Sequence, residues 1–214
     1  RASIGFYFAT RPPSRVPVGL QLGTYVIDIP PGESRYVVED SYVLPVDVEV
    51  HAIYPHAHYL GKDIQAYALL PDGTRRWLIW IRDWNFAWQA VYRYRRPVAL
   101  PRGSVIRMRY TYDNSAANPR NPSDPPRRVT AGNRAVDEMA HLWLQVLPRR
   151  AEDRLLLQEA LMRRRLEKYP GDFVAHVNLG AVLQALGRLD EALAHLRAAV
   201  AARPDDARGL NSLG

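Results

Sequence analysis

The sequence contains no cysteine, and only Lys62 and Lys168 are lysines among its 214 residues. The absence of cysteine excludes disulfide bonds, iron–sulfur clusters, attached c-type haem, zinc–thiolate sites and cysteine-ligated copper. No apolar run reaches the length of a transmembrane helix. A metal site in this chain would therefore use histidine, methionine or oxygen ligands.

Positive charge is abundant and consists almost entirely of arginine, which gives a formal net charge of +7. Residues 1–150 hold 20 basic and 13 acidic side chains, a difference of seven, whereas residues 151–214 hold nine of each. A basic surface can meet nucleic acid, anionic lipid or an acidic protein. These arginines are scattered and accompany no recognition motif, so we expect a solvated or partner-facing surface and no nucleic-acid partner.

The first two thirds of the chain carry short β-branched and aromatic runs separated by Pro/Gly turns. This spacing predicts a mainly β, antiparallel, jelly-roll-like sandwich. We assign residues 19–148 to this domain. Residues 1–18 are interpreted as the end of a preceding β domain and a linker, with a strand over residues 1–9. Because both ends of the sequence interrupt a pattern, we expect the chain to be part of a longer protein.

Residues 151–214 change to a helical period and predict a tetratricopeptide repeat segment, with one complete repeat over residues 173–206 and a truncated end. The signature offsets of this 34-residue repeat are occupied by Leu179, Gly180, Leu183, Gly187, Ala192, Leu196, Ala199 and Pro204. Such repeats form extended binding surfaces. We therefore expect a protein partner, within a larger multi-subunit complex.

Two histidines, His56 and His58, follow an apolar run that predicts a strand over residues 46–54. Residues two apart on a strand share a face, so both imidazoles can approach one metal ion. A His-x-His pair alone is a weak signal, and other ligands are needed. Met139, predicted to lie on a final strand over residues 136–147, offers a thioether that favours Cu(I). Most strand methionines, by contrast, fill cores.

These residues carry a family resemblance. The run from His56 to Lys62 (His-Ala-His-Tyr-Leu-Gly-Lys), followed by Asp137-Glu138-Met139, resembles the C-terminal catalytic domain of the copper type II, ascorbate-dependent monooxygenases. This family includes the peptidylglycine- and dopamine-hydroxylating enzymes. The resemblance implies one copper ion per chain at His56, His58 and Met139, an external reductant such as ascorbate, and O2-dependent hydroxylation of a C–H bond. It also implies an exported protein, periplasmic or extracellular, and the missing disulfides indicate a bacterial type.

The sequence departs from this family at the second copper site, which the family builds from three histidines of its N-terminal domain. No such arrangement is formed by the remaining histidines, which are His51, His141, His176 and His195. The complete oxygenase therefore cannot be assembled within this chain.

The substrate end differs as well. Where peptide-amidating members hold the peptide carboxylate with Arg, Asn and Tyr, this chain has Tyr54, His141 and Trp143. We keep these three as candidate substrate-binding residues without a carboxylate clamp. His141 is equally compatible with an extra ligand, a second shell or a core position.

Two other interpretations stay open. The chain is alternatively a non-catalytic assembly or scaffold subunit that uses its repeats for protein binding, so enzyme activity is undecided. A cupin-like His-x-His metal site is the third interpretation, but its expected Glu is missing and it gives Met139 no role.

Overall fold

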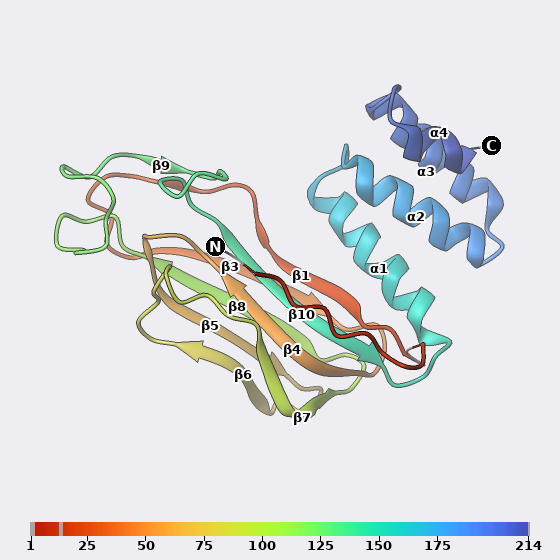
Figure 1. Cartoon of the computed structure of the whole chain (residues 1–214), viewed down its shortest axis with the longest axis horizontal. Coiled ribbons are helices and arrows are strands. Elements are labelled where there is room, and N and C mark those ends of the chain that lie inside the picture. The colour runs from red at the N-terminus through yellow and green to blue at the C-terminus, as the bar shows by residue number, and fades with distance from the viewer. Residues whose placement is uncertain (1–2, 13–14, 214) are drawn as a thin grey trace.

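The computed structural model describes residues 3–12 and 15–213 and shows a β-sandwich followed by helices (Figure 1). Sheet 1 has the strand order β1-β10-β4-β7, and sheet 2 has the order β3-β8-β5-β6. Neighbouring strands within each sheet are antiparallel, which confirms the predicted fold class. A small third sheet pairs β2 with β9. The strands are β1 (Val18–Thr24), β2 (Asp28–Ile29), β3 (Tyr36–Val43), β4 (Val48–His56), β5 (Gly61–Leu69), β6 (Arg75–Ile81), β7 (Tyr92–Leu100), β8 (Val105–Tyr112), β9 (Val129–Thr130) and β10 (Ala140–Pro148).

The core lies between the two sheets, where alternate side chains of each strand point inward. Sheet 1 contributes Leu142 and Leu144, and sheet 2 contributes Ile106 and Met108, all of which are buried. Met108 is thus a core residue, as most strand methionines are expected to be.

A β-bulge between Val50 and Ala52 shifts the register of β4 on both of its neighbours. Beyond the bulge, Tyr54 pairs with Trp143, and His56 pairs with His141. Since the intervening residues of both strands are buried in the core, these four side chains lie on the outer face of sheet 1.

Some predicted elements differ from the structure. Residues 3–9, the described part of the stretch predicted as a strand, pair with no other strand and leave Phe6 and Phe8 exposed, while residues 1–2 lie outside the described residues. The final strand begins at Ala140 and not at residue 136, because a turn closed by Arg134 and Asp137 holds the preceding residues out of the ladder.

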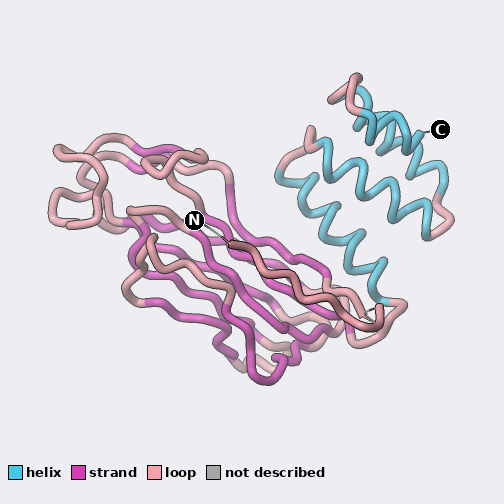
Figure 2. The backbone as a smooth tube through the Cα atoms, in the orientation of Figure 1, coloured by secondary structure: helices cyan, strands magenta, loops and turns pink. Residues whose placement is uncertain are grey.

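The helical segment comprises α1 (Asp153–Lys168), α2 (Phe173–Ala185), α3 (Leu189–Ala202) and α4 (Ala207–Leu213). Successive helices fold back on one another, and α1 lies nearest to the sandwich (Figures 1 and 2). A Cβ atom on Gly180 would lie 2.5 Å from Cδ2 of Leu196, so the glycine allows α2 and α3 to pack closely.

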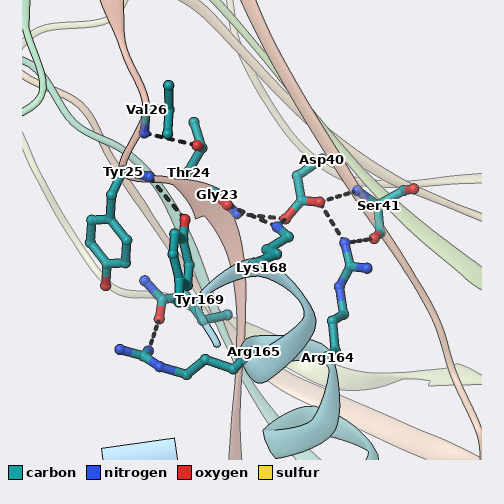
Figure 3. A network of polar contacts seen from close by, with 11 residues as sticks. Gly23, Thr24, Tyr25, Val26, Asp40, Ser41, Arg164, Arg165, Lys168 and Tyr169 are labelled. Carbon is teal, nitrogen blue, oxygen red and sulfur yellow. Dashed lines mark hydrogen bonds and ion pairs between the residues drawn. The ribbon is translucent and has the colours of Figure 1, made fainter. Parts of the chain in front are cut away.

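The end of α1 is fixed to the edge of the sandwich by a polar network (Figure 3). Arg164 and Lys168 both bind the carboxylate of Asp40, which also accepts the N–H of Gly23. Lys168 donates to the carbonyl oxygen of Gly23. These bonds satisfy backbone groups at the edge of β1, where unpaired groups would otherwise invite another strand. Leu157 and Leu161 of α1 join the core of the sandwich. The helix is therefore held to the sandwich by apolar packing as well as by ion pairs.

Candidate metal centre

The structure brings together the three residues that the sequence predicts as copper ligands. His56 ends β4, His58 lies in the short connection between β4 and β5, and Met139 lies just before β10. The Nε2 atom of His56 is 3.2 Å from the Sδ atom of Met139. The ring centroids of His56 and His58 are 5.1 Å apart, with the rings nearly perpendicular.

Hydrogen bonds define which ring nitrogens are free. The Nδ1 atom of His56 lies 2.5 Å from Oε1 of Gln89, and the Nδ1 atom of His58 lies 2.9 Å from the carbonyl oxygen of Asp137. These oxygens accept, so each Nδ1 carries a hydrogen, and in the neutral form of such a ring the Nε2 atom keeps the lone pair that a metal binds. The amide of Gln89 is oriented by its own donation to Phe86. This is the outer-shell pattern that orients metal-binding histidines.

The residues fit a soft metal ion. Burial lowers the pKa of His56, against a smaller opposing effect of the Gln89 hydrogen bond, and so favours the neutral ring that metals require. One ion can bind a nitrogen and a sulfur that lie 3.2 Å apart, since a zinc ion, for scale, lies about 2.0 Å from an imidazole nitrogen and about 2.3 Å from a thiolate sulfur. In the described part of the chain, no three His, Cys, Asp or Glu side chains gather as a metal site. In a site built on these two histidines, the third ligand would be the thioether of Met139, and such a set suits Cu(I).

Glu138 holds the two ligand-bearing segments together. Its carboxylate is fully buried; Oε2 accepts the N–H groups of His58 (2.8 Å) and Met139 (3.1 Å), and Oε1 accepts that of Leu60 (2.7 Å). Burial raises the pKa of Glu138 to about 7, although these hydrogen bonds oppose the shift. One side chain thus fixes the backbone on both sides of the site.

Sequence reasoning did not find this supporting shell. The indole of Trp84 donates to the carbonyl oxygen of His58, and the hydroxyl of Tyr112 donates to that of Met139. Glu138 and Gln89 are equally absent from the sequence-based site. Trp84 and Tyr112 carry no signal beyond an ordinary core pattern, and Glu138 is marked only by its position before Met139.

The three candidate substrate residues form a row beside His56. The ring of Tyr54 lies 6.0 Å from that of His56, the ring of His141 lies 6.4 Å from it, and Trp143 faces Tyr54 across the strands. His141 is only 8% exposed, and its buried Nε2 atom has no hydrogen-bond partner among the described residues. Burial, with a smaller contribution from the charge of His56, lowers the pKa of His141 to about 4.

This shift makes His141 a source of acid destabilisation of the fold. The unfolded chain binds the proton of His141 at the ordinary pKa of 6.5 and the folded chain only near 4, so this stabilising contribution is present above pH 6.5 and is lost towards pH 4. The loss is about 3 kcal/mol. We expect urea unfolding of His141→Gln to lack this loss.

Wild type must be compared with His141→Gln, because Glu138 titrates over the same pH range and changes the unfolding free energy in the opposite direction. Its raised pKa makes stability decline as the pH rises from 4.5 to about 7. The difference in unfolding free energy between wild type and His141→Gln isolates His141, and a difference that is constant from pH 4 to 7 would contradict the prediction. His51→Gln, on the same strand as His56, serves as the control.

Comparison with known protein families finds a match in the helical segment. Residues 154–213 match the family model of the tetratricopeptide repeat. The helical segment is repeat-like. No curated protein matches the sequence significantly. The comparisons therefore support a protein-interaction module and give no support to the copper monooxygenase family. Among the described residues, no helix has the length and apolar character needed to cross a membrane.

Solved structures also match, at low similarity. One is the structure of infectious bursal disease virus Gx strain, with 11% identity and a TM-score of 0.29 over 61% of this chain and 31% of that chain. Another is the VP2 subviral particle of infectious bursal disease virus, with 10% identity and a TM-score of 0.30 over 62% of this chain and 32% of that one. The chain thus spans about a third of those chains, and TM-scores of this size carry no inference.

Proposed function

We propose that this protein is an assembly subunit that binds a protein partner through its helical segment. The match of residues 154–213 to the tetratricopeptide repeat carries this proposal, because stacked repeats present surfaces for proteins. Leu189 and Leu193 lie one turn apart on α3 and are 65% and 37% exposed. They offer an apolar stripe to the partner in a larger complex.

The test uses the protein in its native complex. Tagged Leu189→Glu/Leu193→Glu is expressed in place of wild type, and the mass of the complex is measured by native separation. We expect the double variant to leave the complex. Ala194→Glu, which adds a glutamate to the same helix beside these two leucines, should remain in the complex. A double variant that co-migrates with the complex as wild type does would contradict this role for α3.

We also propose that the sandwich binds one copper ion with His56, His58 and Met139. The contact between Nε2 of His56 and Sδ of Met139, together with the hydrogen bonds that orient both rings through Nδ1, supports this proposal. When bound, copper supplies one-electron redox chemistry and an open position for an oxygen ligand. The protein groups supply two oriented nitrogens, a thioether and the buried carboxylate that holds both segments.

A second candidate function is hydroxylation of a C–H bond by O2 with an external reductant such as ascorbate, in an exported protein. It is favoured by the two-histidine, one-methionine set and by the row of Tyr54, His141 and Trp143 beside it. Reductant-dependent O2 uptake by the copper-loaded protein, lost in His58→Ala and in Met139→Ala, would support it. Uptake that is unchanged in both variants would exclude it.

A further inference from the structure

A cleft of about 300 Å3 lies between sheet 1 and the first two helices, beside the candidate copper site. Clefts of this size hold small molecules. Gly19, His141 and Trp143 line it from the sheet, and Arg165, Tyr169 and Val174 line it from the helices. The helical segment therefore forms one wall of a site whose other wall is the outer face of the sandwich.

Two features of the sheet side leave this site ready for a ligand. A Cβ atom built on Gly19 would meet nothing within 4 Å, so the glycine leaves open space in the strand. His141 is 92% buried, as its 8% exposure implies, and its Nε2 atom has no partner within the described residues. A buried polar atom without a partner is costly unless something else supplies the hydrogen bond.

The walls of the cleft are aromatic. The ring of Tyr25 lies 5.0 Å from that of His141, edge-on, and 5.1 Å from that of Tyr169. Figure 3 shows Tyr25 and Tyr169 side by side where the end of α1 meets the sheet. Trp143 completes the lining from β10. Such walls favour a flat aromatic body, because ring pairs gain energy beyond their buried area.

The charge of the cleft is positive. Arg164, Arg165 and Lys168 line it, and no acidic side chain does so in the described ranges. Arg164 and Lys168 share the single carboxylate of Asp40, and Arg165 pairs with Asp172. Three cationic side chains are thus paired with only two carboxylates, and neither carboxylate lines the cleft. This excess of positive charge favours an anionic ligand and disfavours a cationic one.

We propose that this cleft binds a small organic anion with a flat aromatic body. The ring lies among Tyr25, Trp143 and Tyr169, the anionic group lies toward the cations of α1, and a ligand atom satisfies Nε2 of His141. This inference goes beyond the proposed function, because binding requires neither the metal nor the protein partner. It gives the helical segment a second role in a small-molecule site.

The test is calorimetric titration of the metal-free chain with 2-naphthoate and with 2-naphthylmethylamine, which carries the same ring and the opposite charge. We expect saturable binding of one naphthoate per chain and affinity about tenfold or more lower for the amine. Gly19→Leu should abolish binding by filling the open space, and Trp143→Leu should weaken it about tenfold. Gln145→Leu, an exposed change opposite Gly19 across the strands, should bind as wild type.

Three results would overturn the proposal: no saturable binding of naphthoate, equal affinity for the amine, or wild-type affinity in Gly19→Leu. Circular dichroism and thermal unfolding of each variant confirm that the fold is kept, so lost binding reports the cleft. Because metal-free protein is used, a failure of the copper site leaves these results unchanged, and the two proposals fail separately.

Discussion

Met139→Leu is expected to lower the affinity for Cu(I) by more than about 100-fold. Changes in the outer shell of a metal site already cost about 10- to 100-fold, and this change removes a ligand itself. Leucine keeps the volume of the side chain, so the fold is preserved while the sulfur is lost. The measurement is competition with a chromogenic Cu(I) chelator at constant pH, since metal affinity depends on pH.

Met162→Leu is the matched control for this variant. It removes another thioether, on α1, by the same chemical change and leaves the three candidate ligands in place. We expect it to bind Cu(I) as wild type does. Equal affinity in Met139→Leu and wild type would show that the 3.2 Å contact between Sδ and His56 is packing and not half of a metal site.

Glu138→Ala is expected to lower the free energy of unfolding by about 3–9 kcal/mol. The N–H groups of His58, Leu60 and Met139 would each lose their buried acceptor, at about 1–3 kcal/mol apiece. Urea unfolding near neutral pH measures the loss. Because Glu138 also joins the segments that carry two of the ligands, the same variant should bind Cu(I) more weakly.

Glu138→Gln separates the two effects. A glutamine keeps one acceptor oxygen and the length of the side chain, but its amino group cannot accept. We expect a smaller loss of stability than in Glu138→Ala and little loss of Cu(I) affinity, because an oxygen in the Oε2 position still accepts from His58 and Met139 and only Leu60 loses its acceptor. If Glu138→Ala unfolds at the same urea concentration as wild type, the buried carboxylate does not hold the site together.

The fold class could be predicted because its signals are local. Pro/Gly turns mark several of the strand ends, and the offsets from Leu179 to Pro204 belong to a single repeat. The exposed segment of residues 3–9 shows the limit of this reasoning. Its β-type sequence forms no strand, because pairing depends on a neighbour that the residues themselves do not encode.

The three proposed ligands could be named from the sequence, but the way in which the fold brings them together could not. Strand alternation was expected to align His56 with His58, yet β4 ends at His56 and His58 lies in the connection to β5. Met139 likewise precedes its strand. What aligns them is Glu138, about eighty residues from the histidines in sequence, and a contact at that distance leaves no local pattern. The cleft is equally hidden, since it exists only where α1 packs on sheet 1 and α2 adds residues to the lining.

X-ray absorption of the reduced, copper-loaded protein, with Met139→Leu beside it, tests the copper site most directly. We predict one Cu(I) ion per chain, bound by two imidazole nitrogens and one sulfur, with the sulfur signal absent from Met139→Leu. Copper bound without sulfur in the wild type, or no copper bound at all, would contradict the assignment of His56, His58 and Met139 as a metal site.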